Sequence, residues 1–189
     1  MPGLERFSRR VILAVFLTTL AGSFVSAKVF LTQEEALRLA FPAGTSVARK
    51  TAFLTAAQQE AARRLSGAER APSALVTFYV GTADGREVGT AYFDTHVVRT
   101  QPESLLILID PAGAISRIEI LAFDEPEEYL PRSNWYAQFD GKKLDDSLAI
   151  RRGIRPVSGA TLTARATLEA ARRVLAVHQV LHAPQGKAP

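Results

Sequence analysis

The sequence predicts an α+β fold, an antiparallel sheet packed with helices. Three observations lead to this class. Two helix-start patterns stand near the N-terminus, strand-like segments follow in the middle of the chain, and a long amphipathic segment closes it. Helices and strands that are grouped along the chain, rather than alternating, are typical of α+β proteins.

Each of the first two helices is predicted from a capping box, in which Thr is followed three residues later by Glu or Gln. One helix opens at Thr32 and ends at Ala40, before a proline. The other opens at Thr55 and is closed by Gly67. No other motif assigns residues 28–72, so this stretch is predicted to be an N-terminal helical segment.

The strand-like segments are rich in branched and aromatic residues, and turn residues separate them. They cover residues 75–80, 87–94, 104–110 and 114–123. The third is an almost continuous run of Leu and Ile, as expected for a central strand. The turn Asp110-Pro111-Ala112-Gly113 has Pro second and Gly fourth, which predicts a hairpin between the last two strands.

The most informative motif is Ser158-Gly159-Ala160-Thr161, followed by Leu162 and Thr163. It stands just before the amphipathic segment 164–181, which predicts the C-terminal helix. The small residues allow the backbone to approach a ligand closely. The N-terminus of a helix offers unpaired N–H groups and partial positive charge, which favour a phosphate. A threonine hydroxyl beside such a site could carry a phosphoester.

The motif resembles the flavin-attachment motif of the FMN-binding domain family, which has members in the sodium-pumping NADH:quinone oxidoreductase and the Rnf complex. The resemblance covers residues 75–181. It implies that FMN is esterified through its phosphate to Thr161 by a separate flavin transferase outside the cytoplasm. The other cofactor-binding residues that it implies are Ser158, Gly159, Ala160, Leu162 and Thr163. The alternative is an ordinary helix-capping turn, because Ser and Thr are good N-caps.

Two departures from the family pattern bear on the flavin site. The family often has Asp three residues before the Ser, where this chain has Arg155. Respiratory members also carry a Glu-Thr-Pro-Gly-Leu-Gly loop that contacts the flavin, and the nearest segment here, residues 124–129, lacks both glycines. We therefore expect the ring pocket to be built differently.

Residues 124–147 form a long loop-like segment with two prolines and seven acidic residues. It also contains four aromatic residues: Tyr129, Trp135, Tyr136 and Phe139. Rings and carboxylates together suit the edge of a flavin. The alternative is a loop whose aromatic residues seal the sheet, and the sequence does not decide between the two.

The arginines near the motif also have two interpretations. On a helical wheel Arg165, Arg172 and Arg173 share one wedge with Glu169, which indicates a solvated face with ion pairs. The more specific interpretation is that one nearby arginine offsets the negative charge of the FMN phosphate. The candidates are Arg151, Arg152, Arg155 and Arg165.

Two polar residues are predicted to have structural roles rather than to form a site. His178 falls on the apolar side of the last helix, where we expect it to be packed and hydrogen-bonded. Asp94 ends a strand and is expected to cap the following loop, with a flavin contact as the alternative. No His, Asp and Glu spacing indicates a metal site, and no Gly-x-Ser-x-Gly nucleophile elbow is present.

Residues 1–27 have the pattern of a signal peptide. Three arginines precede the uncharged run 11–25, and Val25-Ser26-Ala27 provides a cleavage site before Lys28. The run is shorter than the roughly 20 residues of a membrane span. An uncleaved anchor and a twin-arginine signal remain the alternatives. The predicted location is the periplasm or another extracytoplasmic compartment.

Behind this signal the predicted organisation is the helical segment 28–72, the FMN-binding domain 73–183 and the tail 184–189. The chain has no cysteine, which excludes disulfides and thiolate-held clusters. The net charge is +4, but no stretch of the sequence interleaves basic and aromatic residues. No nucleic-acid partner is therefore predicted.

The predicted function is that of an exported electron-transfer protein that carries FMN, with no catalytic residues and no metal. Its expected partners are a flavin transferase and an unidentified redox donor and acceptor, membrane-bound partners included. One alternative is a flavin-dependent reductase with its own small substrate. Another is a non-redox domain that has lost flavin.

Overall fold

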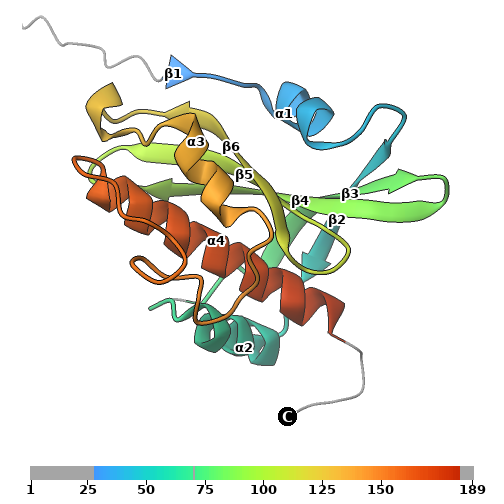
Figure 1. Ribbon diagram of the computed structural model, residues 1–189. Coiled ribbons are helices and arrows are strands. Elements are labelled where there is room, and N and C mark those ends of the chain that lie inside the picture. The colour runs from blue at the N-terminus through green and yellow to red at the C-terminus, as the bar shows by residue number, and fades with distance from the viewer. Residues whose placement is uncertain (1–27, 70, 184–189) are drawn as a thin grey trace, which may run out of the picture.

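The computed structural model describes residues 28–69 and 71–183. Its centre is a six-stranded antiparallel sheet with the order β1-β6-β5-β4-β3-β2. Helices α2 and α4 pack together on one face of the sheet, and α1 covers part of the other (Figure 1). The α+β prediction, with a C-terminal helix that follows the motif turn, is confirmed.

The bounds of the elements follow the chain. The strands are β1 Lys28–Val29, β2 Ser46–Phe53, β3 Leu75–Ala83, β4 Arg86–Val97, β5 Pro102–Ile109 and β6 Ile115–Phe123. The helices are α1 Gln33–Ala40, α2 Ala56–Ser66, η1 Glu127–Tyr129, α3 Ser133–Tyr136, η2 Ala137–Phe139 and α4 Thr161–His182.

Strand β5 divides its side chains between two apolar cores, because successive residues of a strand point to opposite faces. Leu105, Ile107 and Ile109 face α4, and Leu106 and Leu108 face α1. All five are almost fully buried, which confirms that this run of Leu and Ile is a central strand.

The turns and helix ends form where the local sequence predicts them. Asp84 and Gly85 both have positive φ, at 50° and 73°, which suits the tight hairpin between β3 and β4. Both predicted capping boxes are present, at Thr32 and at Thr55. Gly67 ends α2 in the left-handed conformation.

Residues 28–72 contain the two predicted helices and also two strands, which the prediction of an N-terminal helical segment did not include. Strand β2 lies between α1 and α2 and pairs with β3 from Ser46 to Phe53. Its side chains are exposed except for that of Ala52, which is half-buried. The strand therefore lacks the alternation of apolar and polar residues that reveals a half-buried strand. Because β2 extends the sheet and α2 packs on α4, residues 28–72 are not separate from the rest.

Within the long segment 124–147, most of the aromatic residues complete the core. Trp135, Tyr136 and Phe139 lie in short helical turns, are buried and belong to the core cluster beneath α4. The sealing interpretation therefore holds for these three residues. Tyr129 is half-buried and remains at the surface of a cavity.

The arginines of α4 do not form the predicted pairs with Glu169. The guanidinium of Arg172 donates to the carbonyl oxygens of Ser66 at 2.9 Å and Leu148 at 3.0 Å. The guanidinium of Arg173 forms a 2.9 Å ion pair with Asp94 of β4. Both side chains are half-buried, so they connect α4 to its neighbours instead of forming a solvated face.

The predicted signal, residues 1–27, and the tail, residues 184–189, lie outside the described residues. Within the residues that the structure describes, no helix is long and apolar enough to cross a membrane.

Candidate functional site

The Ser-Gly-Ala-Thr motif forms a tight turn that leads directly into α4. Gly159 has a φ of +83°, a conformation that a residue with a Cβ rarely adopts. Ala160 is buried at the N-cap, and the first helical bond runs from the Ala164 N–H to its carbonyl oxygen at 2.9 Å. The helix thus begins at Thr161, three residues earlier than predicted.

The hydroxyl groups of the motif do not cap this helix. No side chain accepts a hydrogen bond at the α4 N-cap. The Thr161 hydroxyl donates instead to the carbonyl oxygen of Val157 over a long 3.3 Å. The motif therefore does not act as a side-chain cap of α4.

The two threonines of the motif differ sharply in exposure. Thr163 is fully buried, and its hydroxyl donates to the carbonyl oxygen of Tyr129 at 2.6 Å. Thr161 is exposed. A reagent from solvent can therefore reach the Thr161 hydroxyl, whereas the Thr163 hydroxyl holds two segments together.

Thr161 opens into a small cavity of about 230 Å³. The turn and the first turn of α4, residues 159–163, form one side, and Arg99 and Tyr129 form the other. The cavity thus combines a hydroxyl, the N-terminus of a long helix and a cationic side chain. These are three features that favour a phosphate group.

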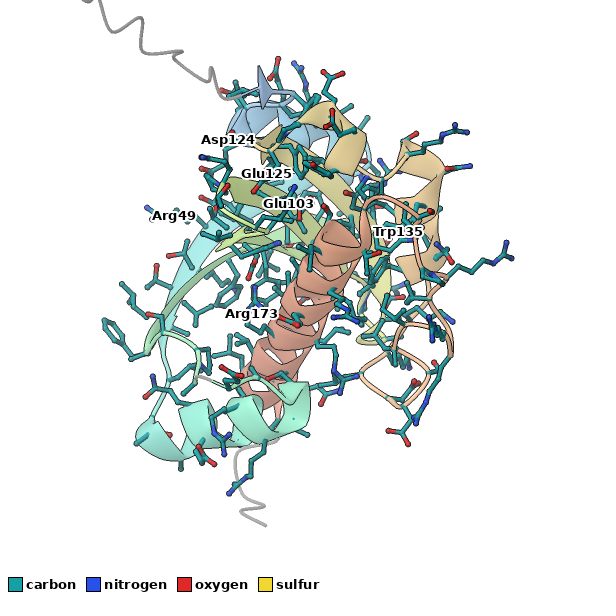
Figure 2. All side chains as sticks on the ribbon, turned by 90° about the vertical axis from the view of Figure 1, so that its left-hand side faces the viewer. Arg49, Glu103, Asp124, Glu125, Trp135 and Arg173 are labelled. Carbon is teal, nitrogen blue, oxygen red and sulfur yellow. The ribbon has the colours of Figure 1, made fainter. Side chains whose placement is uncertain are left out.

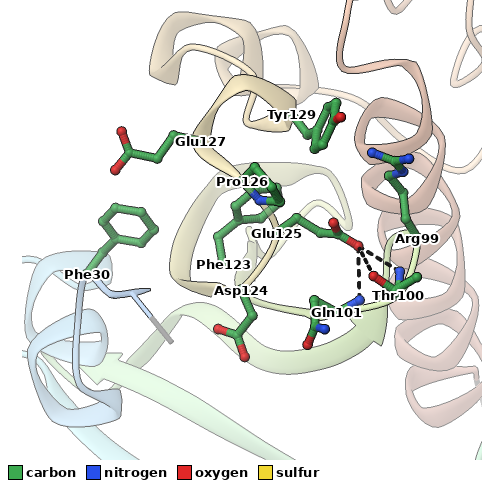
Figure 3. Close-up of a pocket in the computed structure, with 10 residues that line it drawn as sticks. All are labelled: Phe30, Arg99, Thr100, Gln101, Phe123, Asp124, Glu125, Pro126, Glu127 and Tyr129. Atoms are coloured by element: carbon green, nitrogen blue, oxygen red, sulfur yellow. Dashed lines mark hydrogen bonds between the residues drawn. The ribbon is translucent and has the colours of Figure 1, made fainter. Parts of the chain in front are cut away.

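A larger cavity of about 540 Å³ adjoins the first, and Arg99 and Tyr129 line both (Figure 3). Its walls combine aromatic rings with carboxylates and main-chain segments. The remaining lining residues are Phe30, Thr100, Gln101, Phe123, Asp124, Glu125, Pro126 and Glu127. One oxygen of Asp124, Oδ1, is buried and accepts no hydrogen bond from the residues that the structure describes.

Arg99 and Tyr129 stack on each other where the two cavities meet. The Cζ atom of Arg99 lies 4.3 Å from the centre of the Tyr129 ring, a cation–π geometry (Figure 3). Arg99 belongs to the turn between β4 and β5, far from the motif in sequence. No motif surrounds Arg99, so the sequence alone gives no signal for it.

Glu125 fixes the turn that carries Arg99. Its Oε1 accepts hydrogen bonds from the N–H groups of Thr100 at 2.7 Å and Gln101 at 3.0 Å, and from the Thr100 hydroxyl at 3.2 Å (Figure 3). Glu125 as a whole residue is 7% exposed. These hydrogen bonds, first that from the Thr100 N–H, hold the pKa of Glu125 below its usual value.

The segment compared with the family's flavin-contacting loop, residues 124–129, lies beside the motif. Tyr129 accepts the hydrogen bond of Thr163, and the carbonyl oxygen of Glu128 lies 4.0 Å from where a Cβ on Gly159 would stand. The segment thus lies beside the motif although it lacks both glycines.

A solved structure has this fold. It is NqrC from Shewanella oneidensis, with a TM-score of 0.51 and 14% sequence identity. The match covers 72% of this chain and 84% of that one. At this identity the likeness shows a common fold alone. No protein-family profile matches the sequence, and no curated protein does.

The other candidate arginines do not reach the cavity beside Thr161. Its lining residues do not include Arg151, Arg152, Arg155 or Arg165. Arg155 is exposed, and its main chain is fixed to the neighbouring short helices. Its carbonyl oxygen accepts from the Trp135 indole at 2.7 Å and its N–H donates to Gln138 at 2.9 Å.

His178 is packed and hydrogen-bonded, as predicted. Its Nδ1 lies 3.0 Å from the hydroxyl of Tyr92, and its side chain is buried between α4 and the sheet. Burial, and then the neighbouring His182, lower the pKa of His178 to about 4.

Asp94 belongs to a buried charge cluster rather than to a loop cap or either cavity beside the motif. His96 lies between Asp94 at 2.8 Å and Glu103 at 3.0 Å, and Arg173 pairs with Asp94. Glu103 is fully buried and also accepts from Tyr136; Glu103 and Arg173 are labelled in Figure 2. Burial alone would lower the pKa of His96, but its two carboxylate partners raise it to about 9.

Proposed function

We propose that this chain is an FMN-binding electron-transfer protein whose flavin phosphate lies at Thr161. One observation carries the proposal: an exposed threonine hydroxyl stands at the first residue of a long helix, in a cavity that a cationic side chain also lines. The resemblance of the motif to a flavin-attachment motif and the fold in common with NqrC support the same conclusion.

The larger cavity suits the flavin ring system. It adjoins the Thr161 cavity, so one ligand can extend from the phosphate position past Arg99 and Tyr129. Aromatic side chains of the cavity wall provide flat contacts for the ring system. The flavin supplies the redox chemistry, and the protein holds it and limits its contact with solvent.

We further propose that the attachment is covalent and that Thr161 is the residue modified. The step balances if flavin adenine dinucleotide is the donor. The Thr161 oxygen bonds to the flavin-side phosphorus, the pyrophosphate bond breaks, AMP leaves and the hydroxyl proton is released. A separate transferase would catalyse this exchange outside the cytoplasm, where a tether prevents loss of flavin by diffusion.

The redox donor and acceptor are further partners in this proposal. The flavin itself carries out the redox chemistry, so we propose an electron carrier, with a flavin-dependent reductase that has its own small substrate as the alternative.

The test is flavin fluorescence after denaturing electrophoresis of protein made together with a flavin transferase. A fluorescent band is expected for the wild type and for Ser158→Ala, since Ser158 is exposed but does not line the cavity. No band is expected for Thr161→Ala. A band of equal intensity in Thr161→Ala would refute covalent attachment at this residue. A protein that retains no flavin, covalent or free, would support the non-redox alternative.

A further inference from the structure

Arg99 stands between the two cavities with its hydrogen-bonding groups free. Its side chain is exposed and stacks on Tyr129. Within the described part of the chain, its guanidinium forms no hydrogen bond and no ion pair within 4.0 Å. Stacking on a ring orients the guanidinium but uses none of its five N–H donors, so these remain available to a ligand.

We propose that Arg99 is the residue that recognises the phosphate of FMN beside Thr161, an inference that rests on the proposed function. Of the described residues that line the Thr161 cavity, Arg99 is the one cation. A guanidinium matches phosphate oxygens with paired N–H donors, which a lysine cannot do. The N-terminus of α4 lines the same cavity, so two positive groups are available to the phosphate.

Glu125 acts through Arg99 as a positioning residue. It accepts hydrogen bonds from the two main-chain N–H groups that directly follow Arg99, at 2.7 and 3.0 Å. Because this carboxylate is buried, the bonds are shielded from water and keep the turn in one conformation. The turn carries the Arg99 side chain that stacks on Tyr129.

The consequence is selectivity between two flavins that differ only in the phosphate. Riboflavin has the ring and sugar chain of FMN but lacks this group. Arg99 should therefore favour FMN and contribute nothing to riboflavin binding. A hydrogen bond between charged groups is strong enough to change the affinity about tenfold or more.

The experiment measures equilibrium binding of FMN and riboflavin to Thr161→Ala protein, in which covalent attachment is blocked. We expect tighter binding of FMN than of riboflavin. Arg99→Ala in this background should weaken FMN binding about tenfold and leave riboflavin binding unchanged. Added salt should weaken FMN binding less in Arg99→Ala than in its parent. The control is Arg165→Ala, which removes an exposed charge one turn along α4 and should preserve the selectivity.

The outcomes separate the inference from the function on which it rests. If FMN binds but Arg99→Ala leaves its affinity unchanged, or weakens both flavins equally, Arg99 does not recognise the phosphate and the proposed function stands. If no variant binds either flavin, both proposals are overturned.

The role of Glu125 is tested in the same background. Glu125→Gln keeps an acceptor oxygen for the turn and should retain most of the selectivity. Glu125→Ala should lower FMN affinity toward the Arg99→Ala value and leave riboflavin binding unchanged. Loss of both flavins in Glu125→Ala would show that Glu125 shapes the whole cavity and would refute its action through Arg99.

Discussion

At the scale of single residues, the half-buried His96 and the buried His178 respond to pH in opposite directions. His96 lies between two carboxylates, which raise its pKa to about 9. His178 is buried beside Tyr92 and His182, and its pKa falls to about 4. The same side chain is thus charged in one part of the core and neutral in another.

These shifts predict that stability is greatest near pH 6.5, the ordinary pKa of histidine. Between pH 6.5 and 9 the folded protein retains the His96 proton that the unfolded chain has lost, so stability falls as pH rises. Between pH 6.5 and 4 the histidine is protonated in the unfolded chain, whereas His178 stays neutral in the folded protein. Stability therefore falls as the pH decreases.

The measurement is the melting temperature as a function of pH for the wild type, His96→Gln and His178→Gln. His96→Gln should reduce the fall in melting temperature above pH 6.5. His178→Gln should reduce the fall below pH 6.5. An unchanged fall on both sides in both variants would show that neither histidine titrates as the structure indicates.

The sequence predicted part of the site, and the missing part has a clear physical reason. Thr161 was identified because the motif around it is local, with small residues before a helix. Arg99 was not, because its role depends on the pairing of β4 with β5, which brings a distant turn to the motif. The different roles of Thr161 and Thr163 also follow only from burial.

At the scale of elements, Arg172 joins three parts of the fold. Its guanidinium donates to carbonyl oxygens at the end of α2 and in the loop near Leu148, and it lies at the middle of α4. The carbonyl groups at a helix C-terminus have no partner within the helix, so a cation there satisfies them. The helical wheel placed Arg172 with the solvated residues because a wheel shows nothing of neighbouring elements.

We predict that Arg172→Ala lowers the free energy of unfolding by about 1–2 kcal/mol, since charged hydrogen bonds are lost from a half-buried site. Chemical denaturation measures this change. The matched control is Arg165→Ala, because Arg165 is exposed on the same helix, and it should be close to neutral. Equal stability of both variants would contradict the role of Arg172.

Other elements were predicted to the extent that their signals are local. The capping boxes at Thr32 and Thr55 depend on residues three apart, and both form. Strand β2 has exposed side chains on both faces and is held by main-chain pairing with β3. Such an edge strand leaves almost no pattern in its own sequence.

At the scale of the whole molecule, the predicted location of the protein depends on residues 1–27, which lie outside the described structure. Their pattern predicts export and cleavage after Ala27. N-terminal sequencing of protein from the cell envelope should therefore begin at Lys28. Intact Met1 or Pro2 on membrane-bound protein would instead establish an anchor.

In the proposed function, the fold holds one exposed hydroxyl, that of Thr161, beside a phosphate site. The sheet places Arg99, the segment 124–129 places Tyr129, and α4 places Thr161. The three elements meet only in the folded chain, and the buried Thr163 fixes two of them to each other. The central claim is that flavin is attached at Thr161.

Peptide mass mapping tests this claim most directly. Protein made with a flavin transferase is digested with trypsin, and the peptide of residues 153–165 contains Ser158, Thr161 and Thr163 together. We predict an added mass equal to FMN less one water, located on Thr161 by fragmentation. The same added mass on Ser158 or Thr163 would contradict attachment at Thr161. An unmodified peptide would also contradict it, provided that the same transferase is shown to modify another substrate.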